Sequence, residues 1–297
     1  MSFNLREYAA TPRVTDGAWG TQLVRRGLTP GTSPELWNLQ QADLVRAVAD
    51  SYIQAGSDVI LTNTLNANRF ALRGYRLETE TTKLAEAGAR ISRQAADAAK
   101  SAGRDVKVFA SMGPTGVIVM MEEVRRETLS AAFAEAAEAL EFGGADAIVL
   151  ETFNELDELK IALEAVKNAT DLPVVACLTF SSGTDKSLTM MGNSPEDLAK
   201  AARTLGADTV GANCGVGPDN YIAVAKRLRA ACDLPVWIKA NAGLPEVNRG
   251  VTTFPMAPKE FATHGRELLK AGTTFIGGCC GTTPAFIEEL RGVVKRA

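Results

Sequence analysis

The sequence predicts a single-domain α/β protein, folded as a (β/α)8 TIM barrel over residues 1–297. The first supporting observation is periodicity, because short apolar runs alternate with longer amphipathic stretches, as in βα units of a parallel sheet. The second is number and length, because eight such runs and eight such stretches fit a chain of 297 residues. Barrels of this kind commonly fold as one domain of about 250 residues.

The predicted strands are nearly continuous apolar runs, as expected for strands that are buried on both faces. In chain order they cover residues 13–16, 58–62, 106–111, 147–151, 174–179, 209–213, 236–240 and 274–278. The predicted helices lie between and after them, at residues 34–55, 80–102, 127–142, 155–169, 195–205, 219–232, 258–271 and 284–296.

Local signals mark the helix ends. Proline occupies a favourable first helical position at Pro34, Pro195, Pro258 and Pro284. Glycine follows predicted helices just before the next strand, at Gly56, Gly143, Gly206 and Gly272. These junctions recur along the chain and support repeated βα units.

The alternative architecture is a doubly wound open sheet. Such sheets usually carry a G-x-G-x-x-G phosphate motif after the first strand. Here the corresponding residues 16–21 read Asp-Gly-Ala-Trp-Gly-Thr, and residues 183–187 lack the remainder of a P-loop. The barrel is therefore the favoured prediction.

Composition excludes several classes of function. Lys and Arg number 32 against 35 Asp and Glu, which gives a net charge of −3 and argues against nucleic-acid or anionic-membrane partners. No run approaches the ~18 apolar residues that span a bilayer, and the N-terminal residues do not resemble a signal peptide. Five cysteines, an odd number, do not suggest a disulfide framework. We expect a cytoplasmic protein.

Polar residues terminate almost every predicted strand, and barrel enzymes build their sites at these ends. A plain alternative is that strands simply leave the core through polar residues. The terminating residues are Asp16, Thr62, Asn63, Ser111, Glu151, Thr179, Asn213, Cys214, Asn241, Cys279 and Cys280. Cysteines and two carboxylates on one rim favour a site.

The cysteines give the sharpest signal. Cys214 ends the sixth strand and the adjacent Cys279 and Cys280 end the eighth, so strands of the same alternating set bring them together. Flanking glycines allow the backbone to turn there and aim both vicinal thiols at one point. Three thiolates around one point suit Zn²⁺ with an open fourth position. We expect Cys177 and Cys232 to be ordinary buried cysteines.

Histidine contributes nothing to this prediction, since the only one, His264, falls in the middle of a helix and is expected at the surface. Zinc held by three thiolates is electron-rich and therefore poor at activating water. It is well suited to bind a fourth thiol, which loses its proton on coordination and remains nucleophilic at neutral pH. This chemistry predicts alkyl transfer to the sulfur of a thiol substrate.

Five motifs together resemble the homocysteine S-methyltransferase family, in which a zinc-bearing barrel converts homocysteine to methionine. They are Asp-Gly-Ala-x-Gly-Thr at 16–21, Thr-Asn-Thr at 62–64, Glu-Thr at 151–152, Asn-Cys at 213–214 and Gly-Gly-Cys-Cys-Gly at 277–281. The resemblance extends from about residue 16 to residue 284. It implies that Cys214, Cys279 and Cys280 are the catalytic zinc ligands and that Asn241 lines the site near the metal.

The resemblance also implies a substrate clamp. Asp16 and Glu151 match acidic positions that hold the amino end of homocysteine in the family, and the backbone at Gly17 and Ala18 would receive the carboxylate. Glu151 is followed here by Thr-Phe, where some members have tyrosine after the glutamate. The resemblance therefore does not imply a tyrosine hydroxyl contact at this position.

The methyl donor is left open. Residues 33–39 and 62–69 are most similar to the homocysteine domain of cobalamin-dependent methionine synthase, without that enzyme's folate, corrinoid and activation domains. The implied donor is a corrinoid on a partner protein or a sulfonium such as S-methylmethionine, with a betaine-like donor less favoured.

Two other functions remain as alternatives. One is a methyltransferase subunit of a corrinoid-dependent demethylation system acting on another thiol. The other is a non-catalytic barrel that holds zinc, against which Asp16 and Glu151 argue, because holding zinc alone needs no amino-acid clamp.

Overall fold

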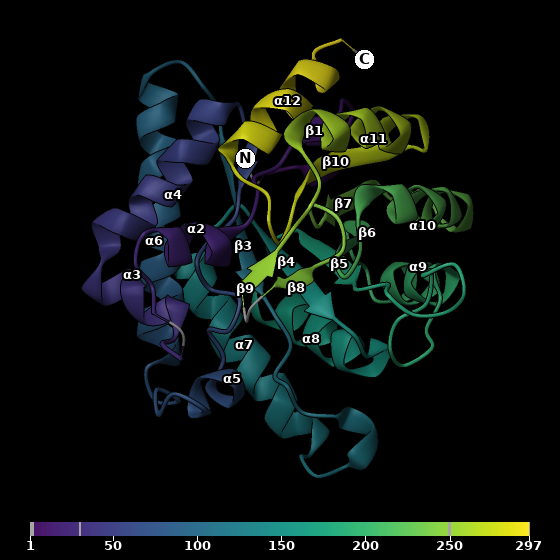
Figure 1. Cartoon of the computed structure of the whole chain (residues 1–297). Coiled ribbons are helices and arrows are strands. Elements are labelled where there is room, and N and C mark those ends of the chain that lie inside the picture. Colours follow the sequence, from purple (N-terminus) through teal and green to yellow (C-terminus); the bar gives the residue numbers. More distant parts are fainter. Residues whose placement is uncertain (1–2, 30, 249–250, 297) are drawn as a thin grey trace.

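The computed structural model describes residues 3–29, 31–248 and 251–296. Within this part of the chain, eight parallel strands form one sheet in the order β1-β10-β7-β6-β5-β4-β3-β2. The sheet curls into a nearly closed barrel surrounded by helices, which confirms the predicted fold (Figure 1). Its strands are β1 (Arg13–Val14), β2 (Val59–Ile60), β3 (Lys107–Met112), β4 (Ala147–Phe153), β5 (Val174–Leu178), β6 (Thr209–Cys214), β7 (Val236–Ala240) and β10 (Thr273–Gly278).

The seam between β1 and β2 is closed by an aspartate. Asp58 N donates to Val14 O at 2.7 Å, and Val14 N donates to the Asp58 carboxylate at 2.9 Å. Arg291 also donates to that carboxylate, at 2.7 Å. Side-chain hydrogen bonds therefore satisfy backbone groups that a regular strand pair would otherwise have satisfied.

The long helices cover the outside of the barrel, and all of them except α4 begin within one residue of their predicted starts. They are α4 (Ala42–Ala55), α6 (Thr81–Ser101), α7 (Arg126–Phe142), α8 (Leu156–Ala169), α9 (Pro195–Thr204), α10 (Pro218–Ala231), α11 (Pro258–Lys270) and α12 (Pro284–Val294). The helix predicted over 34–55 is instead three pieces, η1 (Pro34–Leu36), α3 (Trp37–Gln40) and α4. The break falls at Gln41, whose φ of −139° is not helical.

Several short elements were not predicted, because segments of this length show too little periodicity to be recognised. They are α1 (Leu5–Tyr8), α2 (Trp19–Arg25), α5 (Arg69–Arg73), η2 (Val119–Met121) and the hairpin of β8 (Glu246–Asn248) with β9 (Val251–Thr253). The hairpin is inserted between β7 and α11, and in the view of Figure 1 it lies in front of the strands.

The barrel interior is filled by aromatic side chains. Phe109 and Trp237 stack with ring centroids 5.9 Å apart, and Phe275 lies 5.4 Å from Trp237. A larger apolar cluster fills the space between the strands and the outer helices. Cys177 lies in the inner cluster and Cys232 in the outer one, so both are buried as predicted.

His264 on α11 is half-buried, whereas the sequence suggested a surface position. In the described ranges, no helix is both long enough and apolar enough to cross a membrane.

Candidate active site

Strand alternation delivers the polar side chains to one end of the barrel. Side chains two residues apart on a strand share a face, so each residue two positions after an inner core residue also points inward. The pairs of core and polar residue are Phe109 with Ser111, Val149 with Glu151, Cys177 with Thr179 and Trp237 with Lys239. The polar member lies nearer the carboxyl end in every pair, where barrel sites are built.

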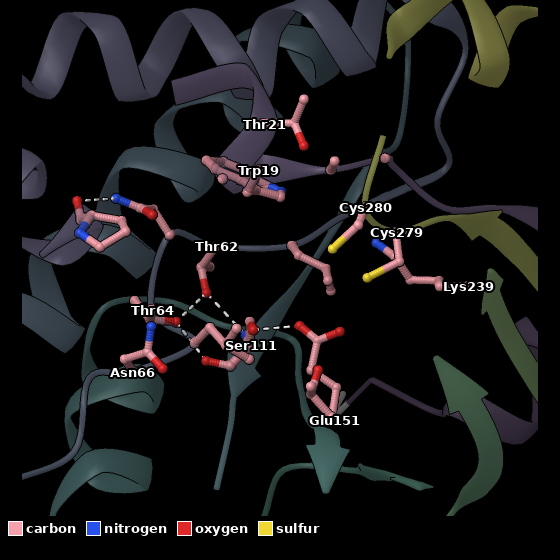
Figure 2. Close-up of a pocket in the computed structure, with 18 of the residues that line it drawn as sticks. Trp19, Thr21, Thr62, Thr64, Asn66, Ser111, Glu151, Lys239, Cys279 and Cys280 are labelled. Carbon is pink, nitrogen blue, oxygen red and sulfur yellow. Dashed lines mark hydrogen bonds between the residues drawn. The ribbon is translucent and has the colours of Figure 1, made fainter. Parts of the chain in front are cut away.

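These ends surround a cavity of about 200 Å³. Its lining includes Trp19, Glu151, Lys239, Cys279 and Cys280, and Figure 2 shows the cysteine side chains near the Glu151 carboxylate. The volume is below that of pockets for drug-sized ligands, which start at about 300 Å³. The cavity therefore suits a small molecule such as an amino acid.

The three predicted cysteines come together. Their sulfur atoms all lie within 4.8 Å of one another, and Cys214 Sγ is 3.9 Å from Cys280 Sγ. Cys214 has a φ of +59°, and the following Gly215 has +63°, so the chain turns sharply where the strand ends. Tyr221 Oη stabilises this turn by donating to the Cys214 carbonyl at 2.8 Å. Beside the vicinal pair, where glycine was expected to permit a turn, Gly281 has a left-handed φ of +83°.

The cysteine cluster concentrates negative charge on one sulfur. Hydrogen bonds from the thiols of Cys279 and Cys280 lower the pKa of Cys214 to about 3. Conversely, the hydrogen bond to Cys214 raises the pKa of Cys280 to about 12 and holds the pKa of Cys279 well above its ordinary value. Two further thiolates therefore require a compensating cation at this point.

The donor set fits Zn²⁺. Thiolate sulfurs are soft ligands that favour zinc, and three of them leave one position of a tetrahedron free. Asn241 supports this fit, because its Oδ1 is buried and has no hydrogen-bond partner among the described residues. Asn241 N donates to Val216 O at 3.1 Å, and the next amide, Ala242 N, donates to Cys280 O at 2.9 Å. This places Asn241 between the two cysteine segments.

Glu151 is the buried carboxylate of the cavity. It is 6 % exposed and accepts hydrogen bonds from Ser111 Oγ at 2.5 Å and Asn213 Nδ2 at 3.3 Å. Burial raises the pKa of Glu151, while the charge of Lys239 and the hydrogen bond from Ser111 lower it. A buried carboxylate with few partners is a favourable site for a ligand ammonium.

Asn213 connects this carboxylate to the cysteine cluster. Its side chain accepts from Thr152 N at 2.8 Å and donates to Thr152 Oγ1 at 2.8 Å, and Thr152 has a left-handed φ of +68°. Because Asn213 directly precedes Cys214, one buried amide fixes the ends of both β4 and β6. The sequence suggested Asn213 only as one polar strand end.

Gly17 and Ala18, the residues predicted to receive the substrate carboxylate, line the cavity. A Cβ at Gly17 would lie 2.8 Å from both Thr282 Oγ1 and Tyr52 Oη, so no larger residue fits without rearrangement. The Ala18 amide already donates to Thr282 Oγ1 at 3.1 Å, and Tyr52 Oη donates to Ala18 O at 2.8 Å. The loop is therefore held against α4 and against the segment between β10 and α12.

Asp16 is fully buried and pairs with Lys239. Among the predicted site residues, Asp16, Cys214 and Asn241 are not in the described lining of the cavity. Lys239 was missed from the sequence. In the sequence, Lys239 stands out as a single charged residue inside the apolar run 236–240. It precedes Asn241 by two positions, so the two side chains are expected on the same face of the strand.

The fold and the site define a (β/α)8-barrel protein with a candidate three-cysteine metal site beside an amino-acid-sized cavity. The family model described as homocysteine S-methyltransferase matches residues 13–294, and the chain belongs to this family.

Two mycobacterial proteins are among its relatives. Methionine synthase from Mycobacterium tuberculosis is 32% identical over 295 residues, which cover 95% of this chain and 24% of that protein. Methionine synthase from Mycobacterium leprae is 30% identical over 306 residues, covering 98% of this chain and 25% of the relative. The chain thus spans about a quarter of the length of these relatives.

A solved structure shares the fold over the whole chain. The homocysteine methyltransferase MmuM from Escherichia coli, in its metallated form, matches with a TM-score of 0.79 and 22% identity, covering 99% of each chain. At this identity the likeness concerns the fold.

Proposed function

We propose that this protein is a zinc-dependent methyltransferase that transfers a methyl group to the thiolate of homocysteine and so produces methionine. The observation that carries the proposal is the placement of three cysteine sulfurs, within 4.8 Å of one another, beside a cavity that also contains the buried carboxylate of Glu151. With zinc bound, the three cysteines would activate a thiol, and the Glu151 carboxylate would hold an ammonium. Homocysteine carries both functions.

Cys214, Cys279 and Cys280 would hold the Zn²⁺, which supplies Lewis acidity that removes the proton of a bound thiol. The metallated state of MmuM supports a metal in this fold family. Glu151 would orient the substrate by accepting from its ammonium, and Asn213 keeps that carboxylate in register with Cys214. The backbone at Gly17 would receive the substrate carboxylate, and its missing Cβ lets this loop pack closely against Thr282 and Tyr52. These residues place the sulfur and exclude water from it.

For the donor we propose a methylcorrinoid carried by a partner protein. Two observations support it: residues 33–39 and 62–69 resemble the corrinoid-dependent branch, and two relatives of similar sequence are methionine synthases. A cavity of about 200 Å³ holds an amino acid but no corrinoid. Such a donor would therefore meet the substrate sulfur at the mouth of the barrel.

The test of the activity is methionine formation by the zinc-loaded protein with homocysteine and a panel of donors. Free methylcobalamin should give at least slow turnover, and betaine should give none. Turnover with S-methylmethionine but not with methylcobalamin would contradict the corrinoid donor and leave the zinc chemistry standing. The absence of both homocysteine binding and methionine formation would instead favour the non-catalytic zinc barrel.

The test of the clamp is the affinity for homocysteine, measured by calorimetry. Glu151→Gln removes a charge-assisted hydrogen bond, typically about 1.5–3 kcal/mol, so the Kd should rise about 10- to 150-fold. Zinc content should not change. Glu138→Gln is the matched control, because Glu138 is exposed on α7 outside the cavity. An unchanged Kd in Glu151→Gln would refute the clamp.

A further inference from the structure

Lys239 is a charged residue inside the substrate cavity that the proposed reaction does not use. Its side chain is 2 % exposed, yet it lines the cavity together with Glu151 and Cys279. Figure 2 shows it beside Cys279 at the edge of the site. Removing an ammonium from water is costly unless a counter-charge compensates, so Lys239 needs a buried partner.

That partner is Asp16, which has no exposed surface. One carboxylate oxygen of Asp16 accepts from Lys239 Nζ. The other accepts from Leu61 N at 2.7 Å and from Trp19 Nε1 at 2.7 Å. Both oxygens are thus engaged, and the Lys239 side chain lies between the carboxylate and the cavity. An incoming ammonium reaches Asp16 only by displacing the lysine.

We propose that Lys239 is a positioning residue that occupies Asp16 in place of the substrate, so that the amino group of homocysteine is recognised by Glu151 alone. This inference rests on the proposed function, because it takes homocysteine as the ligand. It departs from the two-carboxylate clamp that the family resemblance implies. The charge balance of the site is consistent with this proposal. The charges of Asp16 and Lys239 neutralise each other, which leaves the negative charge of Glu151 to pair with the ammonium of the substrate.

Asp16 also connects three strands of the barrel. Its contact with Leu61 spans the seam at which β1 and β2 do not pair as strands, and its contact with Lys239 reaches β7. Asp16→Asn alone would leave a buried ammonium without its counter-charge. A decisive variant must therefore neutralise both residues together, as Asp16→Asn with Lys239→Met does at similar volume.

The readout is discrimination for the amino group. It is the Kd of 4-mercaptobutanoate, which lacks the amino group, divided by the Kd of homocysteine, both measured by calorimetry on the zinc-loaded protein. Glu151→Gln should lower this ratio about 10- to 150-fold. The double variant should keep it within about threefold of the wild type, since it removes no contact to the ammonium. A purely structural role would change both affinities together and leave every ratio constant.

Lys239→Met provides a positive test. It frees one oxygen of Asp16 for the ligand, so the discrimination ratio should rise if the variant folds. A ratio that collapses in the double variant as it does in Glu151→Gln would overturn the inference, because Asp16 would then contact the substrate directly. A wild type that binds neither ligand would refute the proposed function itself, which is a distinguishable result.

Discussion

Gly281 is the residue on which the geometry of the cysteine cluster depends most directly. It follows Cys280, adopts a left-handed φ of +83°, and any Cβ there would lie 2.3 Å from Phe254 Cγ and 2.5 Å from Phe254 Cβ. Those Phe254 atoms are close to the backbone and cannot move aside by rotation of a flexible end. We therefore predict that Gly281→Ala destabilises the barrel and displaces Cys280.

The magnitude follows from two terms. A left-handed conformation costs a non-glycine residue about 1–2 kcal/mol, partly offset by about 0.4–1 kcal/mol from the stiffer unfolded chain. Overpacking adds about 1–3 kcal/mol. Gly103 is the control that distinguishes the conformational cost from the overpacking cost. Its φ of +85° is nearly identical to that of Gly281, but a Cβ there meets nothing within 4 Å. Gly103→Ala should therefore show only the conformational term, about 1 kcal/mol or less.

The assay is urea unfolding of both variants without metal, since bound zinc would add its own stabilisation. Zinc affinity is then measured by competition with a chromophoric chelator. Gly281→Ala should lose about 1–3 kcal/mol more than Gly103→Ala and should bind zinc more weakly. Equal destabilisation of the two variants, with wild-type zinc affinity in both, would refute the steric argument.

Three further predictions concern the cysteines and the buried groups around them. Cys280→Ala should lose most of its zinc in metal analysis while its circular dichroism stays native. Cys232→Ala is the control, because Cys232 is a buried cysteine outside the cluster. Full zinc retention in Cys280→Ala would exclude Cys280 from the site. Burial raises the pKa of Glu151, so the folded state favours its protonated form and loses stability as the pH rises from 4.5 through the folded pKa. Glu151→Gln should therefore be more stable than the wild type at neutral pH and equal to it below pH 4.5. Urea titrations that give the same difference in unfolding free energy at every pH would contradict this. Asn213→Ala leaves the amide of Thr152 without its acceptor and should lower the free energy of unfolding by about 1–3 kcal/mol. It should also weaken the binding of both zinc and homocysteine. Asn168 is exposed, so Asn168→Ala should change neither the stability nor these affinities.

Much of the fold was predictable because each βα unit carries its own signals. The run 236–240 coincides with β7, and Pro195, Pro258 and Pro284 each begin a helix. Strand parity also determined which residues face inward, so the positions of Glu151 and Cys279 at the cavity follow from local pattern and barrel closure. The break at Gln41 was not predictable, because no proline or glycine marks it.

The sequence by itself determined the barrel, the three cysteines and Glu151, because periodicity and unusual residues at strand ends are local features. Only the tertiary structure decided which buried charged side chains form ion pairs with one another. Lys239 and Asp16 are 223 residues apart, and neither periodicity nor motif spacing indicates that they pair. The burial of both groups makes that pairing obligatory, since an unpaired buried charge is far costlier than a paired one. The composition of the proposed substrate clamp therefore depends on a contact that exists only in the folded chain.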